Sequence, residues 1–260
     1  MTFAAMLGVG LLVGLLIGLT GIGGGSLLTP ILILSGMPPA HAVGTSLAFS
    51  FLTKLSGSIS FMRRKMVHFE IVRDLSIGCL PGSLAGAFVI RYVGVRRPEM
   101  LDEMMLRAIG AALVLVALIM LLRLLPGGVR PKAVDRRLPF ASWQRTAVIV
   151  LTGFMVGALV TVTSIGSAAA LIPAMVLFYR LDSGTLVGTN VFMGTLLAAI
   201  AAIPHAGLGH VDASGVLALV CGSIPGVWIT SRWHGHIPRY IPEGIIGIAL
   251  LAMGIRILTR

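Results

Sequence analysis

Residues 18–30 read GLTGIGGGSLLTP and place four glycines within the five positions of Gly21–Gly25. The stretch lies inside one of the most apolar parts of the chain. Because glycine is unfavourable inside a helix and leaves backbone polar groups exposed, a membrane-embedded chain avoids such a run unless exposed backbone is useful there. The run therefore predicts a break between two short membrane helices, and it raises the question of what the exposed backbone binds.

The composition is typical of a protein embedded in a membrane. The chain has 260 residues, of which 57% are hydrophobic and 11% are charged, and its mean hydropathy is +1.00. These values are too apolar for a soluble domain, and several apolar segments are near the length that crosses a bilayer. The net charge of +11 comes mainly from Lys and Arg in short connections between apolar segments. Such a pattern indicates membrane topology rather than nucleic-acid binding.

Apolar runs separated by helix-breaking residues predict the membrane segments. They cover residues 3–19, 24–36, 42–61, 74–92, 106–125, 146–162, 167–179, 186–204, 213–231 and 243–258. Lys54 is the first charged residue, and since a cleavable signal peptide has a basic start, the first segment is expected to belong to the mature protein. One long basic connection, residues 126–145, is expected in the cytoplasm and separates residues 1–125 from residues 146–260.

The two parts of the chain resemble each other in sequence. Thr20–Pro30 (TGIGGGSLLTP) aligns position by position with Thr163–Pro173 (TSIGSAAALIP). With the register moved by one position, VGTS at 43–46 aligns with VGTN at 187–190, and the Pro-Gly pair at 81–82 aligns with that at 225–226. Three matches in the same order at almost one offset indicate a tandem duplication.

The repeat leads to a predicted fold. As one helix, residues 3–36 would be about 51 Å long, whereas the hydrocarbon core is about 30 Å thick. A pair of short helices that enters the membrane and returns fits better, and three full crossings then follow in each half. The prediction is an all-α polytopic membrane protein with two inverted transmembrane repeats, both termini lying outside. In the alternative, each opening pair is one crossing, the repeats are parallel and both termini are cytoplasmic; more Lys and Arg lie inside under either arrangement.

The turns between the short helices predict an anion site. Backbone N–H groups at a helix start lack partners within the helix, the helix dipole adds partial positive charge, and glycine lets an anion approach closely. Gly21–Ser26 and Ser164–Ala168 are therefore expected to form two walls of one site. Its candidate ligands are Gly21, Gly23, Gly24, Gly25, Ser26, Ser164, Gly166 and Ser167. The alternative is that the small residues only allow helices to pack closely.

The motifs also resemble a known family. TGIGGGSLLTP at 20–30, PAHAVGTS at 39–46, the second copy and the chain length are similar to the TauE/SafE family of sulfite and organosulfur exporters, also called the 4-toluene sulfonate uptake permease family. The resemblance covers essentially the whole chain and implies transport of small sulfur oxyanions across the bacterial inner membrane. The second copy, SIGSAAA, departs from the glycine-rich pattern.

Further polar residues in the predicted segments are candidates for binding. Lys54 lies about thirteen residues into its crossing, where it faces the substrate path or, alternatively, extends toward the cytoplasmic surface. Thr45, Ser46, Thr189 and Asn190 occupy repeat-related positions and suit sulfonate oxygens; the alternative is hydrogen bonding between helices. Two further sets are expected at the membrane interfaces: solvated histidines, His41, His68, His205 and His210, and anchoring tryptophans, Trp143, Trp228 and Trp233.

The sequence favours a transporter over other classes. No enzyme motif is present, and no cofactor or metal site is expected. Asp74, Asp182 and Asp212 lie near segment ends, so no deep carboxylate proton relay is expected. The predicted function is a secondary transporter for sulfite, sulfonates or related anions, with a channel-like anion pore as the alternative and a membrane scaffold as a distant third. The expected partners are the anion and the lipid bilayer, not nucleic acid; homo-oligomer formation stays open.

Overall fold

The computed structural model describes residues 2–20, 25–124, 142–165, 171–172, 175, 179, 181–231 and 240–259. These residues are almost entirely helical and contain no strand, which confirms the all-α fold. The helices are α1 (Phe3–Thr20), α2 (Gly25–Leu34), α3 (Pro39–Arg63), α4 (Phe69–Arg96), α5 (Pro98–Leu124), α6 (Ser142–Thr163), α8 (Ser183–Gly207), α9 (Ala213–Ser231) and α10 (Tyr240–Leu258). The predicted segment 167–179 and the connection 126–145 lie largely outside the described residues.

Five of the described helices are long and apolar enough to cross a membrane: α4, α5, α6, α8 and α9. Shorter apolar helices lie within α1, α2 and α10. α3 is more polar because it carries Lys54 and several Ser and Thr residues. It contacts α8, α2, α9 and α5, so much of its surface faces protein. The chain is a multi-pass membrane protein, as the composition predicted.

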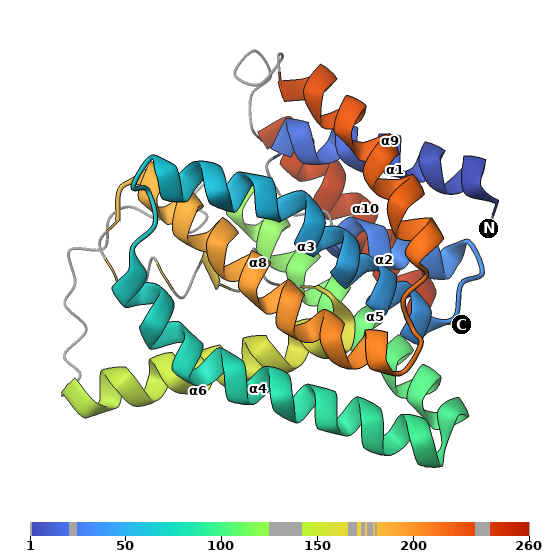
Figure 1. The fold of residues 1–260 in the computed structure, drawn as a ribbon, viewed down its shortest axis with the longest axis horizontal. Helices are drawn as coiled ribbons and strands as arrows, with labels where there is room; N and C mark the ends of the chain where they lie inside the picture. The colour runs from blue at the N-terminus through green and yellow to red at the C-terminus, as the bar shows by residue number, and fades with distance from the viewer. Residues whose placement is uncertain are drawn as a thin grey trace.

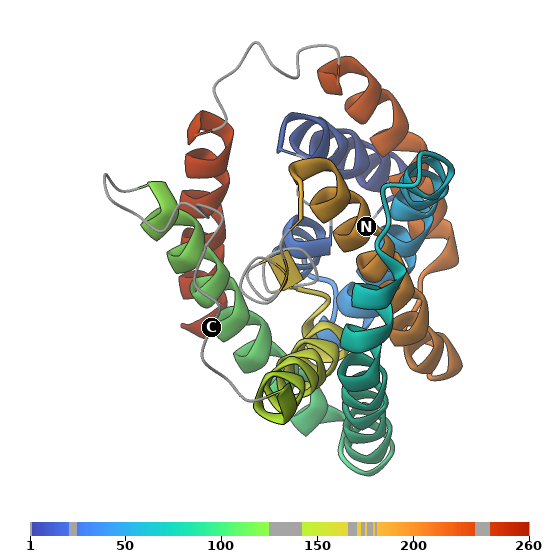
Figure 2. The same cartoon turned by 90° about the vertical axis from the view of Figure 1, so that its left-hand side faces the viewer.

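The helices pack mainly in pairs that join the two halves of the chain (Figure 1). α1 packs against α9, α4 against α6, α3 against α8 and α5 against α10; Figure 2 shows α5 and α10 side by side. Glycines bring the backbones of the first two pairs together. A Cβ added to Gly153 would lie 2.8 Å from the carbonyl oxygen of Leu75, and one added to Gly10 would lie 2.9 Å from Leu219 Cα.

Contacts in one half recur in the other at matching positions of the repeat. Gly14 faces the backbone of Ser223, and its repeat equivalent Gly157 faces the backbone of Cys79, the equivalent of Ser223. The turn after α3 and the turn after α8 also match. The amide of Met66 donates to the carbonyl of Phe61 (3.0 Å), and that of His210 donates to the carbonyl of His205 (2.8 Å).

Helices at matching positions of the two halves run antiparallel. Along α3 and α8, Gly44 lies against His205, whereas Gly57, further along α3, lies against Val191, nearer the start of α8. α5 and α10 behave in the same way, since Gly110 lies against Leu258 whereas Leu121 lies against Gly247.

The opening pair returns the chain to the end where α3 begins. α2 begins beside Ser50, near the middle of α3, and ends at Leu34, shortly before Pro39, so it runs antiparallel to α3. Figure 1 draws both chain ends on its right, near the start of α3, and the basic turn between α3 and α4 on its left.

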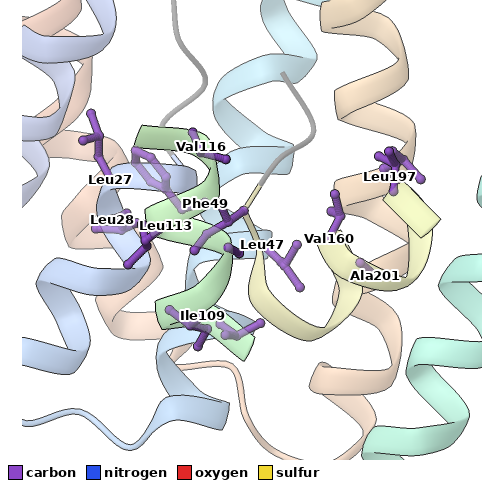
Figure 3. Packing of buried hydrophobic residues seen from close by; sticks show 14 of the residues in the cluster. Leu27, Leu28, Leu47, Phe49, Ile109, Leu113, Val116, Val160, Leu197 and Ala201 are labelled. Carbon is purple, nitrogen blue, oxygen red and sulfur yellow. The ribbon is translucent and has the colours of Figure 1, made fainter. Parts of the chain in front are cut away.

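The start of α2 is enclosed by protein. Gly25, Ser26 and the following four residues are all buried. Leu27 and Leu28 of α2 pack in a core with residues of α3, α5, α6 and α8, including Phe49 and Leu113 (Figure 3). Irregular backbone at membrane depth is stable only where protein or a water-filled cavity surrounds it. This packing therefore permits a helix to begin inside the protein.

Candidate anion-binding site

Three elements from both halves meet at Gly25. A Cβ added to this glycine would lie 2.7 Å from Ser50 Oγ of α3, 2.9 Å from the carbonyl oxygen of Ser164 and 3.0 Å from Ser164 Oγ. Ser164 directly follows the last residue of α6. The first turn of α2, the middle of α3 and the end of α6 therefore leave no room for a side chain at position 25.

Ser164 combines an unusual backbone conformation with a buried hydroxyl. Its φ is +59°, a conformation that is uncommon for residues other than glycine and that concentrates at functional sites. Hydrogen bonds hold it there: its amide donates to the carbonyl of Val160 (2.7 Å), and the next amide, of Ile165, donates to Thr163 Oγ1 (3.1 Å). The side-chain oxygens of Ser164 and Ser50 are buried without a hydrogen-bond partner in the described part of the chain. An unsatisfied buried hydroxyl costs about 1–3 kcal/mol, so these two groups favour a ligand or water between them.

The start of α2 adds a favourable field to these hydroxyls. Ser26, in its first turn, is buried, and Thr29 Oγ1 donates to the carbonyl of Gly25 (3.1 Å). A helix start presents amide hydrogens and partial positive charge, which stabilise an anion. The arrangement has two hydroxyl donors beside a buried helix terminus, which is suited to the oxygens of a small anion. Five predicted ligands lie outside the described residues: Gly21, Gly23, Gly24, Gly166 and Ser167.

Thr45 and Thr189 are engaged in contacts between elements. Thr45 Oγ1 accepts a hydrogen bond from the amide of Asp212 (3.1 Å), and Thr189 Oγ1 accepts one from the amide of His68 (3.0 Å). The two bonds are equivalent under the sequence repeat, and both threonines are fully buried. Each threonine therefore holds a turn of the other half. These contacts are of the kind expected if the threonines serve in hydrogen bonding between helices.

Ser46 and Asn190 lie far from each other. Their side-chain oxygens, Oγ and Oδ1, have no partner in the described residues. Because α3 and α8 are antiparallel, with Ser58 Oγ 2.7 Å from Thr195 Oγ1 near one end of the contact, Ser46 and Asn190 lie toward opposite ends of the pair. Of these two residues, Ser46 is the one on α3, where it lies one turn before Ser50 on the same face of the helix.

Lys54 lies one helical turn beyond Ser50, toward the basic end of α3. Residues four apart on a helix share a face, so Lys54 follows the face that carries Ser46 and Ser50. Its side chain is half-buried within the protein. The sequence identified Lys54 but not Ser50, because position 194 in the second half is glycine and the repeat comparison gave no signal.

The expectation for the histidines is wrong in part. His205 is fully buried (0% exposed), and its ring packs 5.6 Å from that of His210, which lies 5.3 Å from that of His41. Spacing alone gives no sign that these three rings, from α3, α8 and the following turn, come together. His68 is exposed as expected. Trp143 and Trp228 are also exposed, and Trp233 lies outside the described residues.

Comparison with known proteins agrees with this picture. The family described as "Sulfite exporter TauE/SafE" matches residues 6–257. "Probable membrane transporter protein YjnA" of Bacillus subtilis is 36% identical over 96% of this chain and 97% of its own length. "Probable membrane transporter protein YunE" of the same organism is 26% identical over 99% of this chain and 98% of its own length.

A shorter match covers only part of both chains. "Probable membrane transporter protein YfcA" of Escherichia coli is 38% identical over 72 residues, which is 27% of each chain. No solved structure matches the chain. The buried helix start, the membrane-spanning helices and the match over nearly the whole length together place the chain: it belongs to the TauE/SafE family and is a membrane transporter.

Proposed function

We propose that this protein is a secondary transporter that moves small sulfur-containing anions, such as sulfite or sulfonates, across the bacterial inner membrane by alternating access. The observation that carries the proposal is the meeting of Gly25, Ser50 and Ser164. Here two buried hydroxyls, without partners in the described part of the chain, face a helix start. The name of the matching family, which includes the words sulfite exporter, supports a sulfur oxyanion as the substrate.

The chemistry of the site suits such an anion. Sulfite and sulfonate groups carry several oxygens on one sulfur, and each oxygen accepts hydrogen bonds. The hydroxyls of Ser50 and Ser164 can donate two of these bonds, and the amides at the start of α2 can donate others. Lys54, one turn away on α3, supplies a positive charge on the basic side. The proposal also includes Gly21, Gly23, Gly24, Gly166 and Ser167, which the sequence predicts as further ligands.

The alternating-access part of the proposal rests on inverted repeats, 1–125 and 146–260, joined by a cytoplasmic linker at 126–145. The antiparallel packing of α3 with α8 and of α5 with α10 supports inversion, as do the recurring glycine contacts. Gly25 and Ser164 lie near the middle of α3, so rocking one set of helices against the other exposes a fixed site to each side in turn.

The first expected result is selective stabilisation by anions. Sulfite, methanesulfonate and thiosulfate should raise the melting temperature of the purified protein, since a ligand that binds only the folded state stabilises it. A neutral sulfone and a cation of similar size should not. Lys54→Ala should reduce the shift more than Lys54→Arg, which keeps the charge. A shift with the cation and none with the three anions would contradict the proposal.

The second expected result concerns topology. Single cysteines at Thr2 and Thr259, in a background with Cys79 and Cys221 replaced, should both react with a membrane-impermeant thiol reagent on intact cells. Inverted repeats with a returning opening pair place both termini outside. Labelling of neither residue before lysis, together with normal labelling of both after lysis, would rule out the inverted arrangement.

A further inference from the structure

Three histidines form a cluster where α3 begins and α8 ends. The ring of His210, in the turn after α8, lies 5.3 Å from that of His41 and 5.6 Å from that of His205. His205 is fully buried, and the other two are half-buried. All three Nδ1 atoms are buried and have no hydrogen-bond partner among the residues that the structure describes.

The matching place in the other half is a built-in comparison. Under the sequence repeat, His41 corresponds to Thr185, His205 to Phe61 and His210 to Met66. The surrounding packing is alike in both places. A Cβ added to Gly44 would lie 2.5 Å from the carbonyl oxygen of His210 and 3.1 Å from His205 Cβ. One added to Gly188 would meet the carbonyl of Met66 and lie 3.2 Å from Phe61 Cδ1. Because Thr, Phe and Met suffice for this packing, the fold does not require three imidazoles.

The cluster is connected to the candidate anion site. His205 Nε2 lies 3.1 Å from the carbonyl oxygen of Thr161. A carbonyl only accepts, so Nε2 carries the hydrogen and Nδ1 of the neutral ring is left as a proton acceptor. Thr161 is in the last turn of α6, three residues before Ser164. The cluster is therefore in contact with the helix end whose next residue, Ser164, lies at the candidate anion site.

From this arrangement we infer that His41, His205 and His210 form a proton-binding site that couples proton movement to anion transport. The inference rests on the proposed transport of anions and adds the coupling ion. A proton from water at the membrane face where the cluster lies forms an N–H bond at one Nδ1 atom, and the cluster gains one positive charge. The charge accompanies one monovalent anion at the neighbouring site, and the proton leaves to water when the cluster is next exposed.

Asp102 is the acidic group that acts on the cluster, through His210, and one such group fits one bound proton. Asp102 of α5 accepts a hydrogen bond from the amide of Ala40 (3.3 Å), next to His41. Asp212 is held by Ser214 Oγ (2.7 Å) and by the amide of Gly215 (3.0 Å) at the start of α9. The helix end of α6 contributes a carbonyl, not a charge. A second proton would place positive charges on neighbouring rings, whose centroids are 5.3 Å or 5.6 Å apart, and such charges repel each other.

The position of the cluster agrees with proton uptake from the side of the membrane opposite the cytoplasm. It lies at the end of α3 opposite the basic turn of Arg63, Arg64 and Lys65, which the positive-inside rule places in the cytoplasm. Burial lowers the pKa of His210, and charge on His41 lowers it further, whereas Asp102 raises it. Because its pKa is lowered, His210 is neutral at neutral pH and takes up a proton when that face of the membrane is acidified.

The other half of the chain supplies the variant that tests this inference. His41→Thr, His205→Phe and His210→Met, made together, install the residues that already pack at the matching positions. The wild-type protein and this triple variant are reconstituted in vesicles with methanesulfonate, whose charge does not change with pH. Two fluxes are measured: accumulation driven by a pH gradient alone, and exchange of labelled for unlabelled methanesulfonate without a gradient.

The triple variant should keep the exchange and lose gradient-driven accumulation by about tenfold or more. His68→Ala, a variant of an exposed histidine outside the cluster, should keep both. Gradient-driven accumulation in the triple variant, or wild-type flux that does not respond to the gradient, would overturn the coupling and leave the proposed function intact. Wild-type protein that neither binds nor exchanges any tested anion would overturn the proposed function and the coupling with it.

Discussion

Gly157→Val is expected to lower the melting temperature sharply or to prevent the protein from folding. Gly157 of α6 faces α4 so closely that an added Cβ would lie 2.9 Å from the amide nitrogen of Ser83 and would meet the carbonyl of Cys79. Backbone atoms of a packed helix cannot rotate away as a side chain can. Overpacking of this kind costs about 1–3 kcal/mol and sometimes more, and valine adds two further methyl groups at the same point.

The measurement is the melting temperature and the elution profile of the purified variant in detergent. Gly8→Val is the matched control, since it makes the same change in a helix where nothing lies within 4 Å of the added Cβ. Gly14→Val, at the position matching Gly157, should behave like Gly157→Val, because Gly14 faces the backbone of Ser223. A folded Gly157→Val protein with an unchanged melting temperature would mean that α4 and α6 are not in backbone contact.

Gly25→Ala is expected to weaken anion binding more than a substitution that only removes one hydrogen-bond donor, such as Ser50→Ala. The new methyl group would lie 2.7 Å from Ser50 Oγ and 3.0 Å from Ser164 Oγ, in the space where the two hydroxyls meet the start of α2. In the proposed site, displacing these donors would weaken several hydrogen bonds to the anion at once. A loss of only about 1.4 kcal/mol is already tenfold in affinity, so we expect a decrease of at least that size.

The anion-induced shift in melting temperature and the exchange flux measure this effect. Gly57→Ala on α3 is the control, because its Cβ would make an ordinary contact of 3.5 Å with Val191. If Gly25→Ala does not fold, Ser50→Ala tests the same site without adding volume, and it should weaken anion binding while the protein stays folded. Full anion affinity in folded Gly25→Ala and in Ser50→Ala would remove this site from the transport path.

Helix positions could be predicted well from the sequence because long apolar runs and their Gly and Pro breakers set them locally. Segment 213–231 coincides with α9, and segment 3–19 ends one residue before α1 does. The contact between Gly25 and Ser164 was within reach because both lie in the repeated motif. Ser50 was not, since its neighbours are set by the return of α2 along α3, which no local pattern encodes.

The burial of the histidines also could not be predicted from local sequence. Histidine is usually found where the protein meets water, and His68 is exposed in this way. His205 is buried because the antiparallel pairing of α3 and α8 places it beside Gly44, which has no side chain to exclude the ring. The alignment of the two halves shows that these positions are not histidine in both copies. His205 and His210 match Phe61 and Met66 of the first half, and His41 matches Thr185 of the second half.

The pairing of α1 with α9 has a consequence for how the protein is made. Gly10 contacts Leu219, so α1 leaves the ribosome roughly 200 residues before its partner, which is about 10–40 s at ordinary rates of synthesis. α4 and α6 are much closer in the chain and can associate first. During the wait, Gly10 and Gly14 lack the contacts with Leu219 and Ser223 that they have in the folded protein, and premature association of two nascent chains through this face is a risk of such an order of assembly.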